Sequence, residues 1–191
     1  MRGLWGMTIA GSLLGGAALV SGCATGAKAA DGPSRMVWAE LRNASGASVG
    51  SALLRQDGGR VRIVVQASGL TPGRHGIHVH AVGQCEPPSF QSAGAHFNPL
   101  GKKHGLESPE GPHGGDLPDL EADASGRVEY VAVTDRVTLG TGPTSVFDPD
   151  GSAIVIHQQP DDQRTDPSGN SGDRVLCGQL VAGPTTSLLR P

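Results

Sequence analysis

The sequence predicts an all-β protein, an eight-stranded Greek-key β-sandwich or barrel with long loops. Short runs of alternating apolar and polar residues recur along the chain, and turn signals separate them. Glycine and proline are abundant, at 30 and 14 of 191 residues, whereas aromatic residues make up only 3%. The regular alternation argues against a disordered chain, and the length suits one domain with a well-formed core.

The expected strands begin with two that flank the turn-rich segment NASGASVG at residues 43–50. A hairpin turn follows at residues 56–59, and the next run alternates cleanly, with Val61, Ile63 and Val65 on one face. A second turn occupies residues 70–73. The eight expected strands cover residues 37–41, 51–55, 61–67, 75–83, 127–134, 136–139, 153–157 and 174–182.

Residues 84–123 show no sustained period and are rich in proline, glycine and histidine. A structureless segment of this length is uncommon inside a compact domain, so its order needs a source. A bound metal and a disulfide would supply one.

The first 22 residues have the pattern of a targeting segment. Arg2 supplies a positive charge, residues 13–20 form a short apolar stretch, and the sequence VSGC ends at Cys23. This pattern is typical of a bacterial lipoprotein signal, whose cysteine becomes the lipidated first residue of the mature protein. A transmembrane span is the alternative, but the apolar stretch is short and interrupted by glycine.

The expected organisation has four parts. Residues 1–22 are a signal peptide, 23–36 a lipidated flexible tether, 37–183 the folded domain and 184–191 a C-terminal tail. The lipid would anchor the protein to a membrane outside the cytoplasm.

Cysteine usage predicts one disulfide. With Cys23 lipidated, Cys85 and Cys177 remain as an even pair in an oxidising compartment. Two free buried thiols are the alternative. The bridge would close a loop of about ninety residues. The entropy that it removes from the unfolded chain would stabilise the fold by ~4–5 kcal/mol.

The charge of the chain limits its partners. The formal net charge is −3 and there is no basic run, so the sequence lacks the electrostatic footprint of a nucleic-acid-binding protein. An anionic substrate would have to be drawn in by a local positive field.

Six of the seven histidines form a pattern that indicates metal binding. His78 and His80 are two residues apart in an expected strand and share a face, while Ile77 and Val79 point into the core. His157 likewise lies opposite the apolar face of its strand. A single H-x-H pair is weak evidence, because a solvated histidine is the more common case.

The other candidates lie in the segment without a period. His96, His104 and His113 are eight and nine residues apart, and Asp116 follows three residues later. Three nitrogens and one oxygen suit a closed tetrahedral zinc site, and imidazoles suit copper. Two four-coordinate ions need eight ligands where seven are present, so His96 would serve both ions as an imidazolate.

Five segments together resemble the copper/zinc superoxide dismutase family: GIHVHAVGQC, SAGAHFNPLGKKHG, GPHGGDL, VIHQQPDD and GNSGDRVLCG. The likeness runs from about Val37 to Ala182, in family order. It implies a Greek-key domain with long metal-binding and electrostatic loops. It also implies the ligands, which are His78, His80, His96 and His157 for copper and His96, His104, His113 and Asp116 for zinc.

The resemblance assigns roles to residues around the ions. Asp161 would hydrogen-bond one ligand of each metal, here His78 and His104, and so fix their orientation. His75 matches a structural histidine of the family. Arg174 would attract and orient the superoxide anion, and with His96 it would be a catalytic residue.

The implied reaction converts superoxide to dioxygen and hydrogen peroxide. One superoxide reduces Cu(II), and a second takes an electron from Cu(I) and protons from His96 and water. Zinc has no redox chemistry and would hold the loop. The loop at residues 158–173 carries Arg164 but no lysine, and Asp173 precedes Arg174. The contribution of Arg164, Lys102 and Lys103 to steering is therefore left open.

Two other functions compete with this enzyme. A catalytically silent copper- or zinc-binding protein on the same fold would be expected to lack a copper ligand or the arginine, whereas this chain keeps both. A purely structural sandwich would have no reason to keep seven ligands. The expected partners are superoxide and the membrane, reached through the lipid, with a homodimer as an open alternative.

Overall fold

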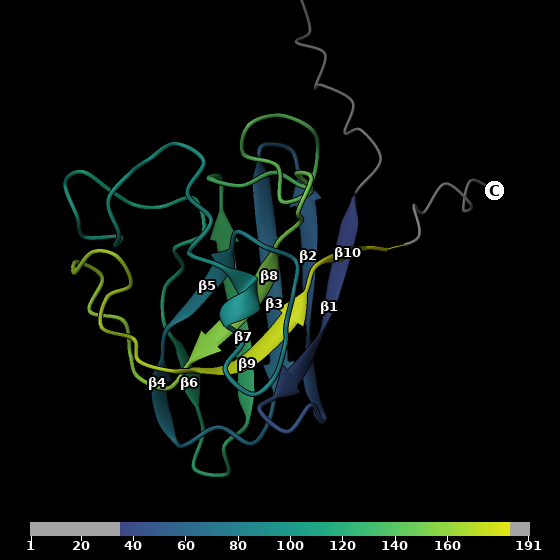
Figure 1. Ribbon diagram of the computed structural model, residues 1–191, viewed down its shortest axis with the longest axis vertical. Coiled ribbons are helices and arrows are strands. Elements are labelled where there is room, and N and C mark those ends of the chain that lie inside the picture. Colours follow the sequence, from purple (N-terminus) through teal and green to yellow (C-terminus); the bar gives the residue numbers. More distant parts are fainter. Residues whose placement is uncertain (1–34, 184–191) are drawn as a thin grey trace, which may run out of the picture. The chain divides into compact units, whose positions relative to one another are not determined.

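The computed structural model describes residues 35–183 (Figure 1). This range contains ten strands, a 3-10 turn (η1, Gln91–Ala93) and no α-helix. The strands are β1 (Met36–Asn43), β2 (Ser48–Asp57), β3 (Arg60–Ala67), β4 (Gly73–His75), β5 (Ile77–His80), β6 (Leu120–Ala122), β7 (Val128–Thr134), β8 (Ala153–His157), β9 (Arg174–Gln179) and β10 (Val181–Ala182).

All ten strands belong to one antiparallel sheet. Its order is β4-β6-β7-β3-β2-β1-β9-β8-β5, and β10 pairs with β1. The end strands β4 and β5 are joined through Gly76 alone, so the sheet curls into a nearly closed barrel. Neighbours far apart in sequence, β3 with β7 and β1 with β9, give the Greek-key connections. The predicted fold class is confirmed.

The barrel interior is filled by the apolar half of each alternating strand. In β3, Val61, Ile63 and Val65 are fully buried, while Arg62 and Gln66 on the opposite face are exposed. The same alternation in β1 and β7 completes the larger of two apolar clusters, which is closed by Ile77, Val79, Ile154 and Ile156 from β5 and β8. Period-two alternation therefore places one face of every long strand in the core.

Two expected strands differ in the structure. The run at residues 75–83 is divided because Gly76 exchanges backbone hydrogen bonds with Gln159 and His157. The run at residues 136–139 is not a strand, so that prediction was wrong. Thr138 forms only an isolated bridge with Ser145, and the Gln56 side chain accepts the Leu139 N–H at 2.7 Å in place of a strand partner.

Long loops cover one side of the barrel (Figure 1). The segment at residues 98–115 lies beside the loop at 158–173, where the Glu107 N–H donates to the Gln163 carbonyl at 3.1 Å. Residues 84–123, which have no hydrophobic periodicity in the sequence, contain only η1 and the three-residue strand β6. Its order comes from contacts with the other loop and with the barrel.

Several predicted features fall outside residues 35–183, namely the signal peptide, Cys23, nearly all of the tether and the C-terminal tail. In the described part of the chain, no helix has the length and hydropathy needed to cross a bilayer.

Candidate metal centre

Two neighbouring strands bring three histidines together. His78 and His80 alternate with core residues along β5, which pairs directly with β8, and His157 ends β8. We expected these side chains on the outer face of the barrel, and they are there, but the loops cover them and leave each at most 3% exposed. The histidines therefore lie between the sheet and its loop layer.

The first group of possible ligands consists of His78, His80, His96 and His157, whose ligand atoms all lie within 4.8 Å of one another. Backbone carbonyls orient two of the rings. His80 Nδ1–H donates to the Gly94 carbonyl at 3.0 Å, and His157 Nδ1–H donates to the Gly172 carbonyl at 3.2 Å. The two free Nε2 atoms are 3.4 Å apart, which suits two ligands of one cation.

The second group surrounds Asp116, a fully buried carboxylate. Its Oδ1 atom lies 3.1 Å from Nδ1 of His96 and 3.1 Å from Nδ1 of His104. Its Oδ2 atom accepts the backbone N–H groups of Gly105 and His113, at 2.8 and 2.9 Å. These two bonds fix the carboxylate so that Oδ1 faces the imidazoles.

His113 is the least tightly grouped of the predicted ligands. The second group whose ligand atoms all lie within 4.8 Å of one another consists of His78, His96, His104 and Asp116. It includes His78, and the predicted zinc ligand His113 is outside it. His113 Nδ1 is nevertheless 3.4 Å from Asp116 Oδ1, and it is buried without a hydrogen-bond partner. His78 has only its Nδ1 free, because its Nε2 is bonded to Asp161. We therefore favour His113 as the fourth member around Asp116.

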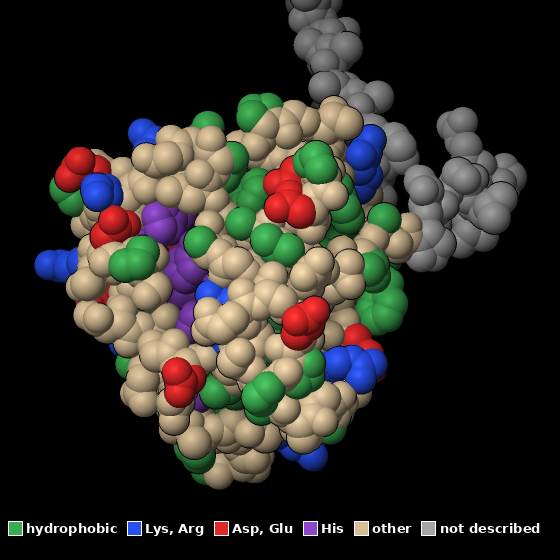
Figure 2. All heavy atoms as spheres, viewed as in Figure 1, with side chains coloured by type: hydrophobic (Ala, Val, Ile, Leu, Met, Phe, Trp, Pro, Cys, Tyr) green, Lys and Arg blue, Asp and Glu red, His purple; other side chains and the backbone are tan. Residues whose placement is uncertain are grey.

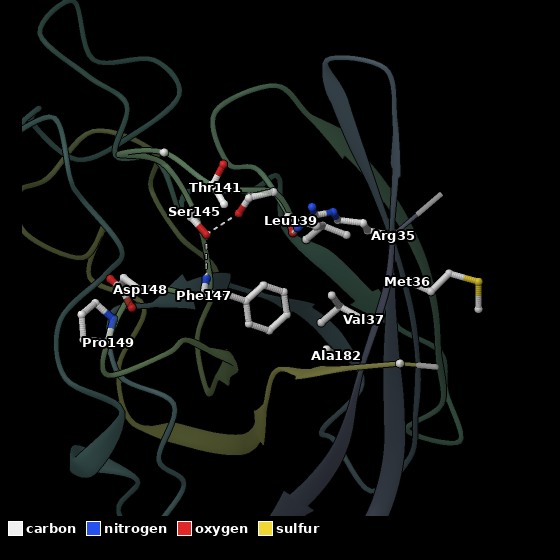
Figure 3. A pocket seen from close by; sticks show the side chains of 13 residues that line it. Arg35, Met36, Val37, Leu139, Thr141, Ser145, Phe147, Asp148, Pro149 and Ala182 are labelled. Atoms are coloured by element: carbon white, nitrogen blue, oxygen red, sulfur yellow. Dashed lines mark hydrogen bonds between the residues drawn. The ribbon is translucent and has the colours of Figure 1, made fainter. Parts of the chain in front are cut away.

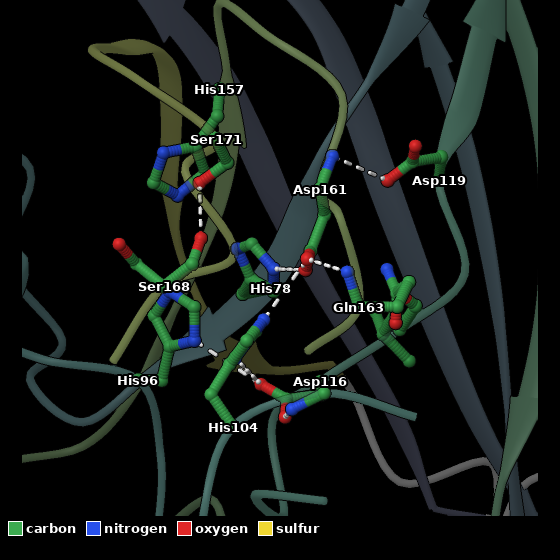
Figure 4. Close-up of polar contacts among 12 residues, drawn as sticks. His78, His96, His104, Asp116, Asp119, His157, Asp161, Gln163, Ser168 and Ser171 are labelled. Carbon is green, nitrogen blue, oxygen red and sulfur yellow. Dashed lines mark hydrogen bonds and ion pairs between the residues drawn. The ribbon is translucent and has the colours of Figure 1, made fainter. Parts of the chain in front are cut away.

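Asp161 connects the two groups (Figure 4). One carboxylate oxygen accepts from His78 Nε2 at 2.7 Å and the other from His104 Nε2 at 3.0 Å. Close packing requires glycine beside it, because a Cβ on Gly169 would lie 1.7 Å from Asp161 Oδ1, and Gly169 has a positive φ of 63°. The side chain predicted to orient one ligand of each ion thus contacts both predicted partners.

The electrostatics of the site favour neutral rings in one group and a cation in the other. Burial lowers the pKa of His96 to about 4 and that of His157 to about 3, so both rings are neutral at pH 7, as metal ligation requires. Burial also disfavours charge on His104, but hydrogen bonds to Asp116 and Asp161 outweigh it and raise its pKa to about 9. The field of these two carboxylates attracts positive charge.

Unpaired buried nitrogens show that the residues fit metal ions. His78 Nδ1, His96 Nε2 and His113 Nδ1 are buried and have no hydrogen-bond partner. Such atoms are costly to leave unsatisfied, and imidazole nitrogens are common ligands of copper and zinc. The donor sets, four imidazoles on one side and imidazoles with one carboxylate on the other, suit copper and zinc respectively.

Arg174 lies beside the first group, at the start of β9. Its guanidinium donates to the Phe90 and Gly94 carbonyls, both at 2.7 Å, and Gly94 is also the acceptor for His80. Figure 2 shows histidine side chains in a hollow of this face, with basic atoms beside them. Burial lowers the pKa of Arg174, yet an arginine remains charged at neutral pH.

The predicted disulfide joins Cys85 to Cys177, with 5.6 Å between their Cα atoms. It attaches the loop that carries Phe90 and Gly94 to β9, which carries Arg174. The bridge therefore holds the arginine and its two carbonyl acceptors in one unit.

The other cations considered for steering are mostly paired with acids. Arg164 forms an exposed ion pair with Glu107, and Lys103 lies 3.2 Å from Asp166. Lys102 is exposed and has no ion-pair partner among the described residues. Arg174 is therefore the positive charge placed closest to the histidines by its contacts.

Sequence reasoning missed three contributors to the site. The Asp119 side chain accepts the backbone N–H of Asp161 at 3.1 Å, and it forms an ion pair with Arg74 at 2.9 Å. Arg136 donates to the Asp116 carbonyl at 2.5 Å. The only signal for Asp119 was its position three residues after Asp116, which does not separate it from a solvated acid. Nothing in the sequence around Arg136 indicated a role.

The barrel and its two adjoining ligand groups define a β-barrel metalloprotein with space for two cations. The chain belongs to the copper/zinc superoxide dismutase family, because residues 48–180 match the family described as copper/zinc superoxide dismutase (SODC). Copper and zinc are therefore its cofactors, and superoxide dismutase is its enzyme class.

Individual relatives agree with the family. Over 144 residues the chain is 46% identical to superoxide dismutase [Cu-Zn] 2 of Aquifex aeolicus, covering 74% of this chain and 84% of that protein. It is 43% identical over 145 residues to a superoxide dismutase-like protein of Bacillus subtilis, covering 74% of each. The crystal structure of a SOD-like protein from Bacillus subtilis superposes with a TM-score of 0.73 at 41% identity, covering 75% of this chain and 97% of that one.

Proposed function

We propose that this protein dismutates superoxide to dioxygen and hydrogen peroxide at a histidine-bridged copper-zinc centre. The observation that carries the proposal is the position of His96. It belongs to both ligand groups, with Nδ1 facing Asp116 and a buried Nε2 that has no hydrogen-bond partner. One ring with two such nitrogens is suited to bridge two cations.

The proposed ligands follow from these contacts. When bound, copper supplies the one-electron redox change and zinc a fixed positive charge. Copper would be held by His78, His80, His96 and His157, and zinc by His96, His104, His113 and Asp116.

The remaining chemistry belongs to residues of the chain. Arg174 binds the superoxide anion through its charge and keeps it beside the histidines. His96 Nε2 takes up a proton and returns it during turnover, and water supplies the second. Two superoxide anions and two protons then give one dioxygen and one hydrogen peroxide. Asp161 keeps both of its histidine partners oriented throughout.

Metal analysis combined with a superoxide assay tests the proposal. The protein loaded with both metals is expected to bind one copper and one zinc and to turn over superoxide rapidly. Zinc binding without activity after copper loading would contradict the proposal and favour a catalytically silent metal-binding protein on the same fold.

Replacing Arg174 by alanine is expected to slow turnover and to weaken its dependence on salt. The physical reason is that Arg174 is the charge held against the histidines, and local steering raises association rates roughly 10-fold or more. The measurement is kcat/KM for superoxide across a range of ionic strength, with copper content checked in each sample.

Arg164→Ala is the matched control, because Arg164 is exposed and already paired with Glu107. Its rate and salt response are expected to stay close to those of the unchanged protein. An Arg174→Ala variant with full copper and an unaltered salt response would remove Arg174 from the mechanism.

We also propose an extracytoplasmic location and a lipid anchor at Cys23. The Cys85–Cys177 disulfide supports the location, since such bonds persist in oxidising compartments. The anchor rests on the sequence VSGC and the apolar stretch before it. The proposal includes the domain organisation given above: a signal peptide at residues 1–22, a tether at 23–36, a folded domain at 37–183 and a tail at 184–191. We also propose that the protein forms a homodimer.

A further inference from the structure

A histidine that binds a metal ion through one ring nitrogen usually donates its other ring N–H to an acceptor in the protein. Four of the proposed ligands have an outer ring nitrogen that is hydrogen-bonded to an oxygen of the fold, namely His78, His80, His104 and His157. His96 is proposed to use both of its nitrogens. His113 is the remaining histidine of the proposed set, so its outer nitrogen needs an acceptor as well.

The outer nitrogen of His113 faces the carboxylate of Asp166. His113 Nδ1 lies 3.4 Å from Asp116 Oδ1 and has no hydrogen-bond partner among the described residues, whereas Nε2 lies 3.7 Å from Asp166 Oδ1. This distance exceeds that of a hydrogen bond, and about 0.7 Å of movement would bring the two atoms within the usual range. An aspartate is ionised at neutral pH and accepts hydrogen bonds only, so it suits the N–H of a ring that binds a cation through Nδ1.

Two further contacts hold the Asp166 side chain in this position. Its Oδ1 atom also accepts the backbone N–H of His104 at 2.9 Å, and its Oδ2 atom lies 3.2 Å from Lys103 Nζ. The side chain is 42% exposed, but Oδ1 is directed at two of the proposed zinc ligands. One oxygen atom therefore contacts the backbone of one ligand and faces the ring of another.

The contact joins two loops that the fold already holds together. Asp166 belongs to the loop at residues 158–173, whereas both histidines belong to the segment at 98–115 (Figure 1). The loops approach so closely that a Cβ on Gly105 would lie 2.0 Å from the Gln163 carbonyl oxygen. The Asp162 carboxylate accepts two backbone N–H groups of its own loop and so fixes the turn that leads to Asp166. The position of Asp166 is therefore set by backbone contacts on both sides.

We propose that Asp166 is a positioning residue of the zinc site, which accepts the Nε2–H of His113 and ties the loop at residues 158–173 to this ligand. The inference rests on the proposed zinc ligands and adds a residue that has no role among them. Removing an outer partner of this kind costs about 10–100-fold in metal affinity, because the partner fixes the orientation and the tautomer of the ring. Zinc retention then depends on both loops, although only one of them supplies ligands.

Zinc affinity tests the inference independently of turnover. Asp166→Ala is expected to raise the zinc dissociation constant about 10-fold or more, since it removes the acceptor for His113. Asp166→Asn is expected to recover most of that affinity, because the N–H groups of His104 and His113 favour its amide oxygen at the Oδ1 position. Competition with a chromophoric zinc chelator measures each constant. The copper content of each variant is measured in parallel and is expected to stay the same.

A spectroscopic signature separates contact with His113 from a general effect on stability. The protein is loaded with zinc and with Cu(I), which is diamagnetic, and proton–nitrogen NMR spectra record its ring N–H groups. The Nε2–H signal of His113 is expected to be observed in the unchanged protein and to be lost to exchange with water in Asp166→Ala. The ring signals of His78 and His104, which donate to Asp161, are expected to remain.

Two control variants change other charges. Lys103→Met removes the ion pair of Asp166 and keeps its carboxylate, and it is expected to change the zinc dissociation constant by at most about 5-fold, as for an exposed ion pair. Asp148→Ala removes a carboxylate that lines a separate pocket of about 590 Å³ between the start of β1 and the loop at residues 139–149 (Figure 3). It is expected to leave the zinc dissociation constant unchanged.

The inference is wrong if Asp166→Ala binds zinc as tightly as the unchanged protein, or if its His113 signal persists. It also fails if Lys103→Met weakens zinc binding as much as Asp166→Ala, since the ion pair would then account for the effect. If the unchanged protein bound no zinc, the proposed zinc ligands would fail together with the inference. If the zinc affinities followed the expected order in a protein without superoxide turnover, the proposed activity alone would be refuted.

Discussion

Replacing His157 by alanine is expected to abolish superoxide dismutation while zinc remains bound. His157 belongs to the four-histidine group only, and its Nε2 faces Nε2 of His80 at 3.4 Å. Removing an outer hydrogen-bond partner of a metal ligand already costs 10–100-fold, so loss of a ligand should lower turnover by more than about 100-fold. The measurements are superoxide turnover and the copper and zinc content of the same sample.

Gln158→Ala provides the control, because Gln158 is the next residue and its side chain is exposed. It is expected to leave turnover and both metal contents unchanged. Wild-type turnover in a copper-loaded His157→Ala variant would show that His157 is not a copper ligand. If the variant lost zinc along with copper, His157 would affect both metal sites, which contradicts its assignment to the copper site alone.

The second large effect is expected from replacing both Cys85 and Cys177 by serine. The bridge closes a loop with a sequence separation of 92 residues, and the entropy of such a loop in the unfolded chain is worth about 4–5 kcal/mol. The free energy of unfolding of the doubly substituted protein should fall by that amount. Equilibrium denaturation of both proteins, with metal content matched, measures it.

Turnover of the same variant should also fall, because the bridge joins β9 to the loop that supplies both carbonyl acceptors of Arg174. A useful control is Ser89→Ala, an exposed position in the same loop, which is expected to change neither quantity. An unfolding free energy within about 1 kcal/mol of the original would contradict the entropic account of the bridge.

Alternation along the chain was enough to predict most of the barrel, because one face of each long strand is in the core. The strand predicted at residues 153–157 has the same bounds as β8, and the run at 61–67 differs from β3 by one residue. The run at 136–139 failed for a physical reason. Val137 and Leu139 are buried, but they enter the core from a loop in which the Leu139 N–H bonds to the Gln56 side chain and Thr138 bonds within the loop, to Thr144 and Val146.

The candidate site could be predicted where it consists of histidines and Asp116, because metal-binding side chains in a regular pattern can be recognised in the sequence. Histidines on β5 followed from strand period, and those near Asp116 followed from their clustering in a segment without other order. The carbonyls that orient His80 and His157 could not be foreseen, because every residue has a backbone carbonyl and nothing marks Gly94 or Gly172. Asp119 was equally hidden, since its contact with Asp161 joins residues 42 apart.

The Gly94 carbonyl contacts two residues to which we assign different roles, His80 and Arg174. It accepts from His80 and from Arg174, so the group that orients a proposed copper ligand also positions the charge that we propose binds superoxide. Gly94 itself is constrained, with a φ of 71° and no room for a Cβ, which would lie 2.9 Å from Val82 Cγ2. Substitutions at His80 and Arg174 should therefore show epistasis, with a combined effect that differs from the sum of the single effects.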